Sequence, residues 1–328
     1  IVIFIGIPSS PLGNDVQMQV ELRQTTENNG NFTGQPTASS TFIASGSTAS
    51  LAASGLMGGS YHWQVRVVDL QGYASDWQEF GTAENADFVV HTVPLYTQVR
   101  SSYPSDEATD NWADLDYATG NIGKYSCARA ERATIAKCGC AITSMVMLGR
   151  YYNINSGIDG TDVNPQSINS WLTTNKGYLT SANPDVNGSL IWGKAMEYLG
   201  NIENGVKKTY LVLDFYNASS TADSAIINNY LDSAKPIIVY SGRFGHYFVI
   251  DNKLAATYGV KDPAWYNTKT LNDSDNPTQY VRGYGNKFDK ANLFSYLPVS
   301  KQISAAMYFY LASPAEYLIT DPQGRRLG

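Results

Sequence analysis

Several residue types are scarce in this 328-residue chain, and each scarcity narrows the range of structures and functions. Charged residues make up only 16% of the sequence, the net charge is −6, and residues 1–92 contain no lysine. Such a chain lacks the basic surface that nucleic acids require, so we expect no nucleic-acid partner. Apolar runs are also short. None approaches the roughly 20 residues of a membrane-spanning helix, so we expect no membrane span in this chain.

Cysteine and histidine are scarce as well, with three residues of each. In an oxidising compartment one pair of cysteines can close and one thiol is left over. Cys138 and Cys140 are too close in sequence to bond without strain, which favours a Cys127–Cys138 bridge and a free Cys140. Zinc is the rival explanation, but a Cys-x-Cys step with no nearby histidine fits no common zinc spacing. We therefore expect no metal and no cofactor.

Tyrosine and glycine, by contrast, are abundant, with 23 and 28 residues. Together with the low charge, this composition favours an extracellular, β-rich protein that is secreted or displayed on a cell surface. The sequence starts without an initiator methionine or a signal peptide, and we expect it to be part of a longer polypeptide. Other domains of that polypeptide, or an extracellular assembly, are then expected partners.

The charge distribution predicts a domain boundary near residue 93. Residues 1–92 hold two basic and eight acidic residues, whereas the remainder holds 21 of each. Apolar and polar residues alternate over 16–23 and 60–69, which predicts half-buried strands. His62 alternates away from the face that carries Trp63 and is expected at the surface, while His91 lies at the boundary and is interpreted as incidental.

Residues 1–92 also resemble a fibronectin type III domain. Leu56, a pair of glycines and Tyr61 are spaced as in the tyrosine corner that locks such a sandwich. The resemblance implies an all-β sandwich that serves as a spacer or binding module.

The rest of the chain reads as helices followed by strands. Capping signals and helical periodicity predict helices from residue 140, from 165, over 188–199 and over 221–234. Apolar runs predict strands over 236–240, 245–251, 256–263 and 305–311. This order indicates an α+β domain over 93–312, and residues 313–328 are left as a C-terminal extension or the start of a linker.

Three residues of this domain suit nucleophilic catalysis. Cys140 opens an amphipathic helix, where unpaired backbone N–H groups and the helix dipole favour a thiolate. His246 begins a strand, and an antiparallel hairpin would place it opposite Asp262 at the end of the next strand. Cys140 would then attack, His246 would transfer the proton and Asp262 would orient the imidazole. Asp251 lies roughly 16 Å further along the strand, too far for that role.

Each of the three residues also has a structural explanation. Cys140 could be a small buried apolar residue, His246 a core histidine, and Asp262-Pro263 a turn. The order of the three along the chain, with a single histidine available after residue 91, favours the catalytic interpretation.

The sequence around these residues resembles a known family. The blocks Gly139-Cys140-Ala141-Ile142-Thr143-Ser144 and Gly245-His246-Tyr247-Phe248-Val249 look like those of papain-like cysteine peptidases related to the bacteriocin-processing, double-glycine leader peptidases. The resemblance implies a papain-like fold and a triad of Cys140, His246 and Asp262. It also implies an upstream glutamine that donates to the oxyanion, for which Gln98 is the candidate and Glu107 or Asn111 are alternatives.

The expected function is therefore that of a secreted or surface bacterial cysteine peptidase acting on a peptide or protein substrate. Amidase or acyl-transfer chemistry on the cell wall would use the same triad and stays open. A different alternative is a structural or adhesive component of a larger extracellular assembly, with a peptidase-like domain that is inactive or only processes itself.

Overall fold

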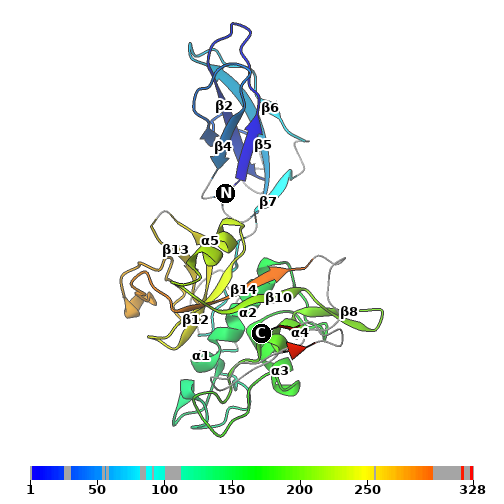
Figure 1. Ribbon diagram of the computed structural model, residues 1–328, viewed down its shortest axis with the longest axis vertical. Helices are drawn as coiled ribbons and strands as arrows, with labels where there is room; N and C mark the ends of the chain where they lie inside the picture. Colours follow the sequence, from blue (N-terminus) through cyan, green and yellow to red (C-terminus); the bar gives the residue numbers. More distant parts are fainter. Residues whose placement is uncertain are drawn as a thin grey trace. The chain divides into compact units, whose positions relative to one another are not determined.

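The computed structural model describes residues 2–25, 31–53, 56, 59–81, 86–90, 92–99, 112–254 and 256–297, and the backbone of two short strands near the C-terminus, β15 (Ile319–Thr320) and β16 (Arg326–Leu327). The chain divides into two compact units, Ile1–Thr92 and Val93–Gly328 (Figure 1). Among the described helices, none has the length and apolar character needed to cross a membrane.

The first unit is built of antiparallel sheets. A two-stranded sheet joins β1 (Val2–Gly6) to β4 (Ala49–Ala53). The larger sheet contains β2 (Val16–Gln24), β3 (Ala38–Ser39), β5 (Gly59–Asp69), β6 (Gln78–Glu79) and β7 (Phe88–Val90). At its centre β2 and β5 pair from Val16 opposite Asp69 to Gln24 opposite Tyr61. Both strands predicted from alternation are thus confirmed.

A hydrophobic core lies between the two sheets of this unit. Alternate residues of β2, including Met18 and Val20, pack with Phe4 of β1 and Leu51 of β4. Because strand side chains point to opposite faces in turn, the period-two pattern places one apolar row in this core. Tyr61 of β5 belongs to the same core.

The expectation of a surface position for His62 was wrong. The side chain is only 2% exposed, and its ring stacks on Phe32 with centroids 4.3 Å apart. The face of β5 that carries His62 is covered as well, because Gln64 on that face donates a 2.7 Å hydrogen bond to the fully buried carboxylate of Glu21. Alternation identified which residues share a face, but it could not show that a loop covers the second face.

The second unit is a mixed α+β body in which most helices precede the sheet. Those before the sheet are the 3₁₀ turn η2 (Ser126–Ala128), α1 (Ile135–Cys138), α2 (Cys140–Tyr151), α3 (Pro165–Thr174) and α4 (Trp192–Tyr198). Two further helical segments, α5 (Ser224–Asp232) and the 3₁₀ turn η3 (Pro277–Gln279), lie between strands of the sheet. Asn164 caps α3 in a capping box with Ser167, as the Asn-Pro signal predicted. The helix expected from residue 188 begins later, at α4, because Leu190 forms a β-bridge with Tyr178.

A five-stranded antiparallel sheet has the order β10-β14-β11-β12-β13. The strands are β10 (Leu211–Ser219), β11 (Ile237–Ser241), β12 (His246–Lys253), β13 (Tyr258–Lys261) and β14 (Lys290–Tyr296). Three of them confirm the strands expected over 236–263. The sequence did not predict β10, β14, or the hairpin of β8 (Gly200–Glu203) and β9 (Val206–Thr209). The strand expected over 305–311 and the expected position of His91 lie outside the described residues.

Helices cover both faces of this sheet. On one face α2 packs against β12, and Ile238 and Val249 join the core that includes most of α2 (Figure 1). On the other face Val239 and Phe248 pack with Ile227 of α5. β11 is thus buried on both sides, which explains its continuous apolar run. The sheet holds β12, and therefore His246, against the helix that begins with Cys140.

The predicted disulfide is present: Cys127 of η2 is bonded to Cys138 of α1, and Cys140 is free. The bridge closes a short loop of sequence separation 11 just before the helix that carries Cys140.

Replacing both Cys127 and Cys138 by alanine is expected to lower the free energy of unfolding by about 2–3 kcal/mol, because the unfolded chain regains the freedom that the closed loop removes. Urea denaturation of the double variant and wild type, both with Cys140 alkylated, measures this difference. As a control, the double variant should not respond to reductant, whereas the wild type should. An unchanged midpoint in the double variant would show that the bridge adds nothing to stability.

Candidate active site

Cys140 is the first residue of α2 and is partly exposed. Gly139 separates α1 from α2, and a Cβ atom there would come within 2.6 Å of the Ile135 carbonyl oxygen. Glycine therefore allows the tight step between the two helices. The N–H groups of the first turn of a helix have no partner within the helix, and the dipole is positive there. The thiol thus lies where the backbone favours negative charge.

His246 is the first residue of β12, where it pairs with Ser241 of β11. Its ring is buried, and Nε2 lies 2.8 Å from Oδ1 of Asp262. The Cys140 side chain lies close enough to the same imidazole to contribute to raising its pKa. Since Nε2 faces Asp262, Nδ1 is the nitrogen that remains for Cys140. The structure therefore brings His246 and Asp262 into direct contact, with Cys140 near the same imidazole.

Asp262 reaches His246 by a slightly different route from the one that the hairpin predicted. The register of β12 and β13 pairs Val249 with Lys261, so Asp262 lies just beyond the end of β13 rather than directly opposite His246. Its side chain spans the remaining offset. Asp251 is directed elsewhere, with a carboxylate oxygen 3.5 Å from Nζ of Lys261.

The Asp262 carboxylate is fully buried and has four hydrogen-bond donors. Oδ1 accepts from His246 and from the backbone N–H groups of Ala264 and Trp265, both at 2.8 Å, and Oδ2 accepts from the hydroxyl of Tyr284. Burial alone would raise the pKa of Asp262, but the charge of His246 and these donors outweigh burial and hold the pKa below its ordinary value. Asp262 is therefore an anion at neutral pH.

His246 shows the opposite balance. Burial alone would lower the pKa of His246, but the charge and hydrogen bond of Asp262, with a further contribution from Cys140, raise it to about 10. The imidazole is therefore protonated at neutral pH and presents a positive charge to Cys140.

Comparisons of the chain with protein-family models, with curated proteins and with solved structures found no match. In the described part of the chain, no group of three or more His, Cys, Asp and Glu side chains is arranged to hold a metal ion.

Gln98 lies in the same region and links two of its parts. Its backbone N–H donates to the carbonyl of Pro263, next to Asp262, and its side-chain Nε2 donates to the carbonyl of Ala136 in α1, each at 2.8 Å. Because a side-chain amide has two N–H donors, one remains for another acceptor. Glu107 and Asn111, the alternatives for this position, lie outside the described residues.

Tyr284 is a site residue that the sequence did not indicate. It precedes β14 in a loop, its ring stacks on Phe248 with centroids 4.4 Å apart, and its hydroxyl donates to Asp262. Burial, together with the Asp262 charge, raises the pKa of Tyr284 well above its ordinary value, so the hydroxyl remains a donor at every pH at which the protein is folded. No motif surrounds Tyr284, and only the folded chain brings it to the carboxylate.

The Tyr284→Phe variant is expected to lose about 1.5–3 kcal/mol of stability, because a hydrogen bond to a buried carboxylate is removed while the ring packing stays. Tyr258→Phe is a matched control: its hydroxyl donates to the neutral amide of Asn228 at 2.9 Å, and its loss should cost only about 1 kcal/mol. Urea denaturation of both variants at pH 7 gives the comparison. Equal losses would show that the Asp262 contact carries no additional stability.

Proposed function

We propose that this protein is a secreted or surface-displayed bacterial cysteine peptidase that cleaves peptide bonds through Cys140, His246 and Asp262. The observation that supports this best is a buried imidazole that is hydrogen-bonded to a fully buried carboxylate and lies near a partly exposed thiol. A structural histidine needs neither a thiol on one side nor a carboxylate with four donors on the other.

The proposed reaction begins with a charge pair. Protonated His246 stabilises the Cys140 thiolate, and the thiolate attacks the carbonyl carbon of the scissile bond. The oxyanion accepts hydrogen bonds from the Cys140 backbone N–H and the second side-chain N–H of Gln98. His246 then gives its proton to the leaving amine, which produces a thioester. A water molecule that has lost its proton to His246 hydrolyses the thioester and frees the thiol.

Asp262 contributes through His246. It fixes which ring nitrogen faces the thiol and keeps the imidazolium favourable in a buried position. Tyr284 and the two backbone donors in turn hold the carboxylate in one orientation. Asp262 thus acts as an orienting and charge-stabilising group.

The proposed function includes a fold assignment for each of the two units. We propose that the second unit is papain-like, since a helix bearing the nucleophile packs on an antiparallel sheet bearing the histidine. For the first unit we propose a fibronectin type III-like sandwich that acts as a spacer or binding module. The disulfide supports an oxidising, extracellular compartment.

A diverse peptide library, analysed by mass spectrometry after incubation with the non-reduced protein, tests this function. We expect new peptide termini at defined positions, and none after Cys140 has been alkylated. If peptides stay intact while cell-wall fragments are cleaved, the amidase alternative replaces the peptidase. If neither is cleaved, the structural or adhesive role becomes the better account.

A further inference from the structure

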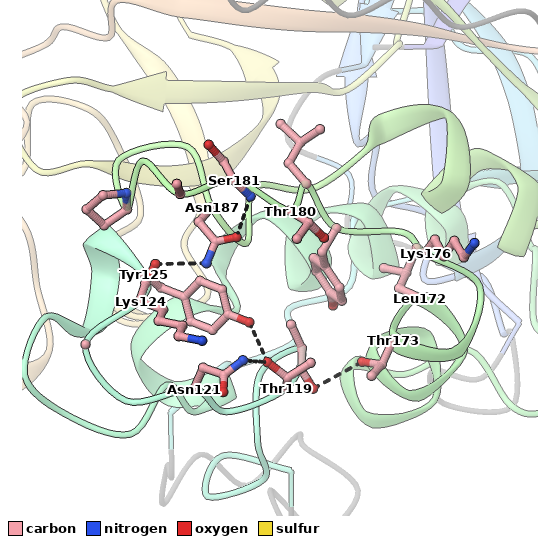
Figure 2. A pocket seen from close by; sticks show the side chains of 16 residues that line it. Thr119, Asn121, Lys124, Tyr125, Leu172, Thr173, Lys176, Thr180, Ser181 and Asn187 are labelled. Atoms are coloured by element: carbon pink, nitrogen blue, oxygen red, sulfur yellow. Dashed lines mark hydrogen bonds between the residues drawn. The ribbon is translucent and has the colours of Figure 1, made fainter.

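A pocket with a volume of about 640 Å³ opens between the loop of residues 118–125 and the segment 172–187 (Figure 2). This volume is within the range of sites that bind small molecules or short peptide segments. The triad does not account for the pocket, because Cys140, His246 and Asp262 do not line it.

The charges around this pocket are of one sign. Lys124 and Lys176 lie on opposite sides of it, and no described lining residue is acidic (Figure 2). The nearest carboxylate in sequence, Asp185, already forms an ion pair with Arg129. Within the described residues, neither lysine has an ion-pair partner. The lining of the pocket therefore carries two positive charges and no negative charge, although the net charge of the protein is −6.

The hydrogen-bonding groups of the pocket point to the same kind of ligand. The walls are fixed internally: Asn187 donates to the carbonyl of Lys124 at 3.0 Å, and the Thr119 and Tyr125 hydroxyls share a 2.8 Å hydrogen bond (Figure 2). The ammonium groups, by contrast, and the hydroxyl of Thr180 have no partner among the described residues. Unpaired donors in a firm frame suit a ligand rich in acceptor oxygens, above all a carboxylate.

Two connections join the pocket to Cys140. The Tyr117 ring packs on the lining residues Tyr178 and Tyr125, with centroids 4.8 and 6.2 Å apart. Burial and, after it, the charge of Cys140 raise the pKa of Tyr117. The second connection is the disulfide. It bonds η2, which begins directly after Tyr125, to the end of α1. The disulfide therefore ties the wall of the pocket at Tyr125 to the segment that ends two residues before Cys140.

We propose that this pocket binds an acidic side chain of the peptide substrate, a few residues from the bond that is cleaved, with Lys124 and Lys176 as the specificity-determining residues. The proposal rests on the proposed peptidase function. A peptide bound at Cys140 would extend into this pocket and place an aspartate or glutamate within reach of the lysine side chains at its edges. An anionic glycan offers carboxylates too, but the proposed peptidase function favours a peptide.

The test compares matched peptides in which one residue is glutamate or glutamine, with the position moved one residue at a time along a cleaved sequence. At one position we expect wild type to prefer glutamate in kcat/KM. The Lys124→Met/Lys176→Met variant should lose about three- to tenfold of that preference, as expected for a partly solvated charge contact. The control Lys287→Met removes an exposed charge outside the pocket and should keep the preference.

The outcomes separate the pocket from the catalytic proposal. Cleavage with equal preference for glutamate and glutamine at every position, unchanged by the lysine variants, would overturn the pocket assignment and leave the peptidase intact. If wild type cleaves no peptide, the pocket assignment is tested by binding instead. The affinities of fluorescent glutamate-rich and glutamine-rich peptides for the Cys140→Ala protein are then compared. Preferential binding of the acidic peptide that needs both lysines supports the pocket. Binding of oligogalacturonate but not of acidic peptide would overturn the peptide assignment.

Discussion

Cys140→Ala is expected to lower kcat/KM for peptide hydrolysis by about 10⁴-fold or more, because no other group in the site can form the thioester. His246→Ala should have a similar effect, since the thiolate and the proton donor act as one unit. For the same reason kcat/KM of the double variant Cys140→Ala/His246→Ala should be scarcely lower than that of either single variant. Initial rates on a peptide that wild type cleaves provide the measurement.

Folding must be separated from chemistry in this comparison. Cys140 is partly exposed, so its replacement by alanine should leave the unfolding midpoint nearly unchanged. Alkylation of wild-type Cys140 is an independent control and should reproduce the loss of activity. Hydrolysis by Cys140→Ala within tenfold of wild type would rule out Cys140 as the nucleophile.

Asp262→Asn is expected to reduce kcat/KM by about 10²–10⁴-fold, because the amide neither stabilises the imidazolium nor fixes its orientation. The variant should also be less stable at neutral pH, since it leaves the protonated His246 buried without its counterion. Asp251→Asn is the matched control. It removes a carboxylate from the same strand as His246, where Asp251 contacts Lys261 of the next strand and not His246.

The pH dependence of stability gives the same variant a second readout. In the folded protein the pKa of His246 is raised to about 10, so its stabilising contribution is complete below its ordinary pKa of 6.5 and is lost as the pH rises through 10. The pKa of Asp262 is lowered, so its contribution is present above its ordinary value of 3.8 and is lost as the pH falls below it. Urea denaturation between pH 3 and pH 10 should show both losses in wild type, and both should be much weaker in Asp262→Asn.

The sequence predicted those parts of the site that depend on local order along the chain. Cys140 at a helix start, His246 at a strand start and Asp262 after the next strand are each marked by a neighbouring glycine or proline. The disulfide followed from spacing alone, because Cys138 and Cys140 cannot bond without strain. These predictions needed only the periodicity of single elements and one hairpin.

Other features depend on contacts between distant segments, and the sequence could not show them. β10 was missed because bulges between Leu213 and Ala218 break its alternation. The burial of His62 depends on Phe32, thirty positions away, and the role of Tyr284 depends on a loop that returns to Asp262. The pocket combines a loop that precedes α2 in sequence with the end of α3 and the segment that follows it, and neither part carries a motif.

The rate of Cys140 alkylation as a function of pH, measured by mass spectrometry on the non-reduced protein, tests the central claim most directly. The account predicts rapid modification of Cys140 near pH 6, a much slower reaction in His246→Ala, and an intact Cys127–Cys138 bridge in both proteins. An ordinary thiol reacts appreciably only as the pH approaches roughly 8.5. If Cys140 behaves in that way and His246→Ala changes nothing, the thiolate–imidazolium pair does not exist and the catalytic account is wrong.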